Sequence, residues 1–226
     1  MAALLALALP SLAGAAPVTL SFPTVGGDYK VTFDPQTLPE EDLRAFVRLS
    51  PHLHGWESYA VAPRLEHCVA GDPDYRECGA RAPGSAHFDW NARRNLERGA
   101  ALLAEVGRLR APRELEPVVE YSRRSLAFSL WLETTKFEFY RTGDAGVLAR
   151  PYEGLEPAAH CGAALDRVRA AAGPEDRYHH ATYTWHNCVN AAYRARLGGY
   201  PLDAWEAFVR RHGIQEAVLE PFGAGR

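Results

Sequence analysis

The first pattern along the chain is an alternation of β-branched or aromatic residues with polar residues. It occurs twice, in VTLSF at 18–22 and in YKVTF at 29–33, with PTVGGD between the two runs. The glycines of PTVGGD permit a tight reversal of the backbone, and a period of two is typical of strands. The pattern therefore predicts a β-hairpin within residues 16–36.

Further along the chain the pattern is helical, with apolar residues that recur every three or four positions. It starts near Asp89 with NARRNLERGAALLAEVGRLR and stops at APRE. It resumes at Pro117, a residue that a first helical turn tolerates, and continues to about Arg141. Three shorter helices are expected where glycines end the apolar period, at 157–172, 182–197 and 202–212.

Between the hairpin and the long helices the pattern is less regular. Thr37 and Glu40 form a capping box ahead of LRAFVRL, which predicts a helix of about 11 residues that ends before Pro51. Residues 51–87 show no sustained period, so we expect an irregular loop there and a helical core over 88–226. The fold class that follows is mainly α: a bundle of about five or six helices with a small N-terminal β-hairpin.

Composition supports a single folded domain and excludes one class of partner. The chain has 226 residues, 47% hydrophobic and 23% charged, which suffices for a core, and we assign one domain to residues 16–226. The formal net charge is -3 and the pI about 6.3, so the chain lacks the basic field that nucleic-acid binding uses. Only Lys30 and Lys136 among the 25 cations are lysines, which we attribute to genomic base composition.

The first 15 residues have the composition of a secretory signal peptide. They contain a short apolar run and end on small residues, with Ala13 and Ala15 in an A-x-A pattern, which predicts cleavage after Ala15. The positive segment that usually opens a signal is missing. The alternative is an uncleaved anchor, because residues 2–22 carry no charge, but the prolines and glycine in this stretch disfavour a spanning helix. We expect a secreted or periplasmic protein with no membrane span after cleavage.

Export makes the four cysteines candidates for disulfide bonds, because oxidising compartments favour bridges. Cys68 and Cys78 bracket VAGDPDYRE, whose turn-forming residues could bring the two together and staple the loop at 51–87. That pairing leaves Cys161 with Cys188. The alternatives are buried free thiols, or Cys188 as a nucleophile, which would leave one of the other three cysteines without a partner.

The long helix that begins at Pro117 has two polar stripes. If each residue advances by 100 degrees, one narrow sector is charged and the opposite one is polar, with apolar residues on both flanks. A stripe between two packed flanks points into the molecule, where an unpaired charge is costly. Glu133 and Lys136 could satisfy each other there as a structural pair, or could line a cleft with Tyr140 and carry out acid/base chemistry. The charged sector holds Glu120, Arg123, Arg124, Glu138 and Arg141, and the inward stripe holds Ser122, Ser125, Ser129, Glu133, Lys136 and Tyr140.

The stretch YHHATYTWHNC at 178–188 contains three histidines. His186 lies at the border between the apolar and polar faces of the helix expected at 182–197, which suits a core histidine and equally a catalytic one at the edge of a cleft. His179 and His180 precede that helix, where exposure is the default. His186 is therefore the best single candidate for a functional imidazole.

A second histidine pair, His52 and His54, would point to the same side of an extended backbone and could supply half of a zinc or copper site. The chain has no HExxH, CxxC, GxSxG, P-loop or GxGxxG sequence, so the common signatures of proteolysis, redox, hydrolysis and nucleotide binding are absent. The leading hypothesis is an exported, disulfide-stabilised helical binding module. The alternative is a secreted hydrolase that uses a metal ion or the acid/base residues His186, Glu133 and Lys136, which would then have to converge on one site.

Overall fold

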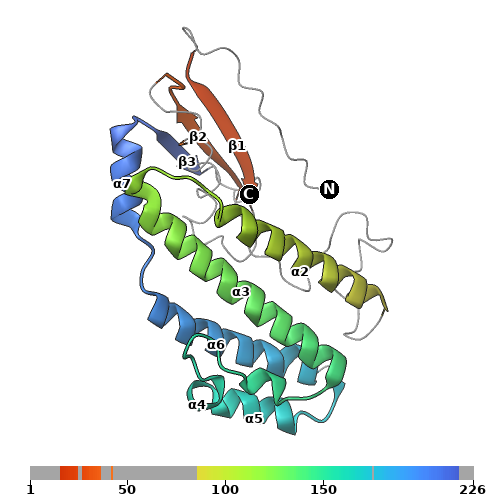
Figure 1. Ribbon diagram of the computed structural model, residues 1–226. Helices are drawn as coiled ribbons and strands as arrows, with labels where there is room; N and C mark the ends of the chain where they lie inside the picture. Colours follow the sequence, from red (N-terminus) through yellow and green to blue (C-terminus); the bar gives the residue numbers. More distant parts are fainter. Residues whose placement is uncertain (1–15, 25–26, 37–41, 43–85, 175, 219–226) are drawn as a thin grey trace, which may run out of the picture. The chain divides into compact units, whose positions relative to one another are not determined.

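The computed structural model describes residues 16–24, 27–36, 42, 86–174 and 176–218. These residues form six α-helices and a three-stranded antiparallel sheet (Figure 1), which confirms the mainly helical fold with an N-terminal hairpin. No helix in these ranges is long and apolar enough to cross a membrane. Several predictions fall outside the described residues: the signal peptide, the helix that ends before Pro51, the pairing of Cys68 with Cys78, and the pair His52 and His54.

The chain gathers into two compact units. The first comprises residues 1–61, 104–123 and 200–226, and the second comprises residues 62–103 and 124–199. The division into two units does not test whether residues 16–226 form one domain, so the single domain stays a prediction.

The sheet of the first unit is built on the predicted hairpin. Strand β1 (Val18–Thr24) pairs antiparallel with β2 (Gly27–Phe33), with Val18 opposite Phe33 at one end of the register. A third strand that the pattern did not predict, β3 (Gln215–Val218), pairs antiparallel with the other edge of β2. The sheet order β1-β2-β3 therefore joins the two ends of the described chain.

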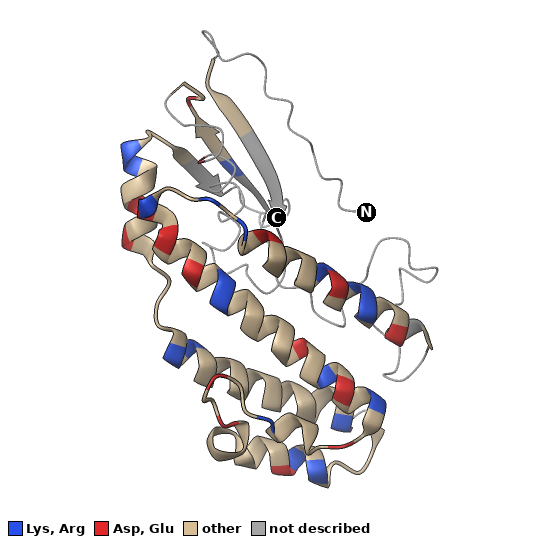
Figure 2. Ribbon diagram, viewed as in Figure 1, with Lys and Arg blue, Asp and Glu red and all other residues tan. Residues whose placement is uncertain are grey.

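Helix α7 (Leu202–Arg211) completes the core of this first unit. Asp203 lies in its first turn and Arg210 and Arg211 lie in its last turn, the arrangement that the helix dipole favours. Figure 2 shows basic residues, in blue, at the end of α7 that leads to β3. Its apolar residues Trp205 and Phe208 are at most 1% exposed. They belong to a cluster that also contains Val31, Phe33, Leu115, Val118 and Ile214.

Two long helices, α2 (Ala86–Val106) and α3 (Glu116–Thr142), extend from one unit into the other. Helix α2 starts three residues before the predicted Asp89 and so takes in the last residues of the expected loop at 51–87. The two helices run antiparallel within the second unit, where the ring of Phe88 meets the ring of Tyr140 at 5.7 Å. The guanidinium of Arg93 lies 5.4 Å from the ring of Phe137.

The predicted helix at 157–172 is wrong in one respect, because it is interrupted. Helix α4 (Pro157–His160) ends at Cys161, whose backbone leaves the helical region with φ -127° and ψ 28°, and α5 (Gly162–Ala170) starts afresh. Cys161 is bonded to Cys188 of α6 (Thr182–Leu197), with an S–S distance of 2.03 Å and 5.9 Å between the Cα atoms. The disulfide predicted between these two cysteines is confirmed.

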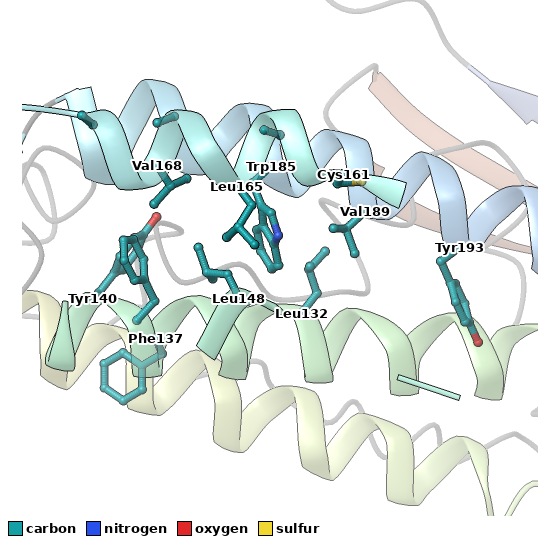
Figure 3. Packing of buried hydrophobic residues seen from close by; sticks show 14 of the residues in the cluster. Leu132, Phe137, Tyr140, Leu148, Cys161, Leu165, Val168, Trp185, Val189 and Tyr193 are labelled. Atoms are coloured by element: carbon teal, nitrogen blue, oxygen red, sulfur yellow. The ribbon is translucent and has the colours of Figure 1, made fainter. Parts of the chain in front are cut away.

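The core of the second unit lies between α3 on one side and α5 and α6 on the other. Figure 3 shows Leu132 of α3 facing Trp185 and Val189 of α6, with Leu165 of α5 beside Trp185. Val168 of α5 lies over Tyr140 of α3 in the same view. Trp185 and Val189 are 0% exposed, as expected for residues one helical turn apart on the apolar face of α6. A π-helical segment (Asp176–Ala181) leads directly into α6.

Candidate acid–base site

The charged sector of α3 faces solvent, as its spacing predicts. Arg123 donates hydrogen bonds of 2.7 and 2.8 Å to the two carboxylate oxygens of Glu120, and the two side chains are 47% and 55% exposed. Further along the helix, Arg150 binds Glu138 with both of its terminal nitrogens, again with both side chains exposed. This side of α3 is an ordinary solvated face.

The opposite stripe of α3 places an ion pair inside the protein. The ammonium of Lys136 lies 3.2 Å from one carboxylate oxygen of Glu133 and 3.5 Å from the other, and the side chains are only 6% and 4% exposed. The two residues lie on successive turns of α3, so one helix positions both. The expectation that this pair is buried and mutually bonded is confirmed.

A third ionisable group comes from α6. The Nδ1 atom of His186 lies 3.6 Å from Oε1 of Glu133, just beyond hydrogen-bond length, and His186 is 6% exposed. The rings of Phe128 and Tyr193 stack between the same two helices, with centroids 3.9 Å apart and planes 7° from parallel. From this contact to the one at Glu133, residue numbers rise along α3 and fall along α6, so the two helices run antiparallel. The structure therefore brings together Glu133, Lys136 and His186, which we call the Glu–Lys–His cluster.

The other residues of the inward stripe have different roles. Tyr140 donates a hydrogen bond of 3.0 Å to the carbonyl of Tyr178, so its hydroxyl binds α3 to the π-helical segment that precedes α6. Ser122 is fully buried, while Ser125 and Ser129 are half-buried. The stripe predicted from the spacing is therefore real, but only two of its members contribute to the Glu–Lys–His cluster.

The surface next to the cluster carries an exposed aromatic ring. Tyr183 lies one turn before His186 on α6, is 60% exposed, and holds its ring within 1° of parallel to the imidazole at a centroid distance of 6.5 Å. His179 and His180 are exposed in the π-helical segment, as expected for residues that precede the helix. Among the three histidines of YHHATYTWHNC, only His186 enters the interior.

Two buried amides on α2 were missed in the sequence. Asn91 and Asn95 are each 1% exposed and lie one turn apart, on the same buried stripe as Phe88 and Ala92. The rings of Phe88 and Tyr140 are in contact, and α2 and α3 run antiparallel. Asn95 follows Phe88 by seven residues, and Glu133 precedes Tyr140 by seven residues, so the two lie at the same level of the helix pair. The signal was available: two polar residues at i and i+4 interrupt an otherwise apolar helical stripe.

The structure offers no support for a metal centre in the ranges it describes. These residues contain no group of three or more histidine, cysteine, aspartate or glutamate side chains placed to hold a metal ion. Glu133 and His186 are two such groups, one fewer than a zinc or copper site uses from the protein. The zinc or copper site considered for His52 and His54 stays a prediction, because both lie outside the described ranges.

Comparison with known proteins leaves the function to be argued from the Glu–Lys–His cluster alone, since no protein-family model, curated protein or solved structure matches the chain.

The cluster can move a proton without charging the interior. With one proton to share, the pair can be an ammonium and a carboxylate beside a neutral imidazole, or an imidazolium and a carboxylate beside a neutral amine. The proton can also sit on the carboxyl group, with both bases neutral. Each of these states has zero net charge, which avoids the several kcal/mol that an unpaired buried ion costs.

Proposed function

We propose that the protein is an exported hydrolase whose acid–base centre is the cluster of Glu133, Lys136 and His186. One observation carries the proposal: a single carboxylate lies 3.2 Å from an amine and 3.6 Å from an imidazole, and all three residues are at most 6% exposed. Convergence of the inward stripe with His186 is the geometric condition that an acid–base enzyme has to meet.

The roles follow from which atoms face each other. Glu133 faces Nδ1 of His186, and a carboxylate at Nδ1 favours the tautomer with its proton there, so Nε2 becomes the basic nitrogen. Nε2 then removes a proton from the attacking water and returns it to the leaving group. Lys136, on the other side of the carboxylate, balances its charge while the imidazole is neutral.

A structural reason for the cluster is weaker than a chemical one. A buried ion pair is frequently no more stabilising than apolar residues of similar size, because desolvation offsets the attraction. Adding a histidine beside such a pair gives a site where protonation states are coupled, and coupled buried groups concentrate at functional sites. Among the described residues, Glu133, Lys136 and His186 are the only Asp, Glu, Lys, Arg or His side chains that are buried.

Export is the second part of the proposal. It is supported by the signal peptide predicted over residues 1–15, and the bond between Cys161 and Cys188 is compatible with an oxidising compartment. Peptide sequencing of the protein recovered from its native cell fraction tests this part, with a mature chain that starts at Ala16 as the expected result.

The hydrolase is tested with chromogenic esters, peptides, glycosides and phosphomonoesters, each assayed with Glu133→Gln and His186→Gln. Both changes keep the side-chain size, and we expect each to lower turnover by about 100-fold or more, the range for loss of a positioned acid or base. His180→Gln is the matched control, because it makes the same substitution at an exposed histidine just ahead of α6. Turnover that survives both buried substitutions in folded protein would refute the proposal.

The exposed ring of Tyr183 favours a second candidate, a binding module that holds a ligand without turning it over. The ring is 60% exposed and parallel to His186, which suits stacking against a planar or cyclic group. In that case Tyr183→Ala should lower affinity while Glu133→Gln leaves it unchanged. A hydrolase should respond to both changes, the first mainly in KM and the second in kcat.

A further inference from the structure

Among the Lys and Arg side chains that form ion pairs within the described ranges, Lys136 is the one lysine, and the others, such as Arg94, Arg123 and Arg150, are arginines. Of the 25 cations only Lys30 and Lys136 are lysines, so the rest are arginines. The exposed i,i+3 pair of α3 uses Arg123, which binds both oxygens of Glu120 with two nitrogens. The buried i,i+3 pair of the same helix instead uses a lysine. The buried pair on α3 therefore contains an amine where the exposed pair contains a guanidinium.

The chemical difference between the two cations is the proton. A guanidinium is always charged, whereas an amine loses its proton readily once it is buried and then becomes a nucleophile. Lys136 is 5% exposed, and Glu133 and His186 offer two nearby places for the proton that the amine releases. In two of the three neutral states of the cluster, the Lys136 side chain is a free amine rather than an ammonium.

We infer that Lys136 is an amine nucleophile that binds the carbonyl group of an aldehyde or ketone as a reversible imine. The lone pair of Nζ attacks the carbonyl carbon, and the C=O electron pair moves to oxygen, which takes a proton and gives a carbinolamine. The C–O bond then breaks, the oxygen leaves as water with a second proton, and the nitrogen lone pair forms the C=N bond. Both protons come from the amine, so the exchange is balanced without an oxidant or a reductant.

Glu133 is the group placed to move these protons. Its carboxylate lies 3.2 Å from the attacking nitrogen, so it can accept a proton from Nζ and deliver it to the leaving oxygen. His186 lies 3.6 Å from the same carboxylate and can hold that proton between the two steps. The inference relies on the proposed function only in locating the chemistry at this cluster, and it adds a covalent class of ligand to the acid–base role.

Reductive trapping tests the inference without any turnover. The full-length, oxidised protein is treated with acetaldehyde and sodium cyanoborohydride at pH 6.5, and the ethylated lysines are counted by peptide mass mapping. Hydride adds to the imine carbon and makes the label permanent. The half-buried Lys30 is the internal comparator, and a sample in 8 M urea shows that both lysine peptides are detected equally.

The expected result is that Lys136 labels at least about tenfold faster than Lys30 in the folded protein, because an ordinary lysine is almost wholly protonated at pH 6.5. In urea the two rates should become equal. Glu133→Gln should slow labelling at position 136 by about 100-fold, the contribution of a positioned proton donor, and leave Lys30 unchanged. Lys136→Arg should abolish the label at that position while the variant keeps its melting cooperativity.

Protection of Lys136 relative to Lys30, or equal rates in the folded state, would overturn the inference and leave a charged structural pair. Labelling of Lys136 that is unaffected in Glu133→Gln would overturn the part assigned to the carboxylate. The two proposals fail separately: hydrolase turnover that persists in Lys136→Arg rejects imine formation as part of that reaction. Fast labelling in a protein without hydrolase activity rejects the hydrolase alone.

Discussion

Replacing Lys136 by methionine removes the charge and keeps most of the apolar volume, which makes it the most direct test of the buried pair. Breaking a buried pair costs roughly 3–5 kcal/mol, because an unpaired carboxylate remains in the interior. We expect a value near the lower end, about 3 kcal/mol, because His186 lies 3.6 Å from Glu133 and can take up the proton that keeps the site neutral. In a chain of this length, about 3 kcal/mol lowers the melting temperature by roughly 6–12 °C.

Helix α3 supplies a matched control for this change. Glu120 and Arg123 have the same spacing and order as Glu133 and Lys136, but their side chains are 55% and 47% exposed. An exposed pair contributes at most about 1 kcal/mol, so Arg123→Met should have a small effect. Urea unfolding at pH 7, followed by circular dichroism, compares the two variants. Equal losses in both would refute the argument that burial makes the pair at 133 and 136 different.

A double substitution separates the pair from the site around it. Glu133→Leu combined with Lys136→Met leaves no buried charge from α3, and well-packed apolar replacements of buried pairs are often neutral or stabilising. We expect this protein to be more stable than Lys136→Met alone. If the double variant is instead the least stable of the set, His186 or a neighbouring polar group needs the carboxylate for its own burial.

Three further predictions concern the frame around the site. Replacing Cys161 and Cys188 by alanine should lower the free energy of unfolding by about 3–4 kcal/mol, the loop-closure value for their separation of 27 residues. A reductant added to the native protein should lower its melting temperature by a similar amount to this double substitution. Burial, followed by the charge of Glu153, raises the pKa of Tyr193, so the unfolded phenol ionises first and stability falls above about pH 10. Tyr193→Phe should reduce that alkaline loss in urea unfolding at pH 9 and 11. Arg196→Ala should cost about 1–2 kcal/mol by calorimetry, because Arg196 donates bonds of 2.6 and 3.0 Å to the carbonyls of residues 154 and 153.

The sequence predicts correctly those features that depend on residues within a single helix or strand. Helix α6 occupies 182–197 as predicted, because its apolar period and the following glycines lie within the element itself. The inward stripe of α3 could be recognised because polar residues there stand between two apolar flanks, so either flank alone predicts burial. The bond between Cys161 and Cys188 followed from pairing arithmetic once export was assumed.

The features that were missed depend on contacts between distant segments. Strand β3 is four residues long and starts with Gln215 and Glu216, so it has no apolar alternation. Its partner β2 lies about 185 residues earlier in the chain, and the pairing joins the N-terminal hairpin to the last element of the described residues. The break at Cys161 lies within PAAHCGAALDRVRAAA, whose alanines favour a continuous helix, and Cys161 is the residue bonded to Cys188 of α6. A helical wheel placed His186 at the edge of a face, but only the packing of α6 against α3 shows which neighbour covers it.

The same distinction decides how the Glu–Lys–His cluster should be interpreted. Two of its members share α3 and could have been kept together for helix stability alone, since i,i+3 pairs of this kind contribute a few tenths of a kcal/mol at a surface. His186 belongs to another helix, α6, and its position opposite Glu133 depends on the register between α3 and α6. The stacked rings of Phe128 and Tyr193 are a second contact in the same register. An intrahelical pair has no need of that third group. The physical argument for chemistry therefore rests on the imidazole, and the labelling rate of Lys136 in a His186→Gln protein measures whether the three groups share one proton.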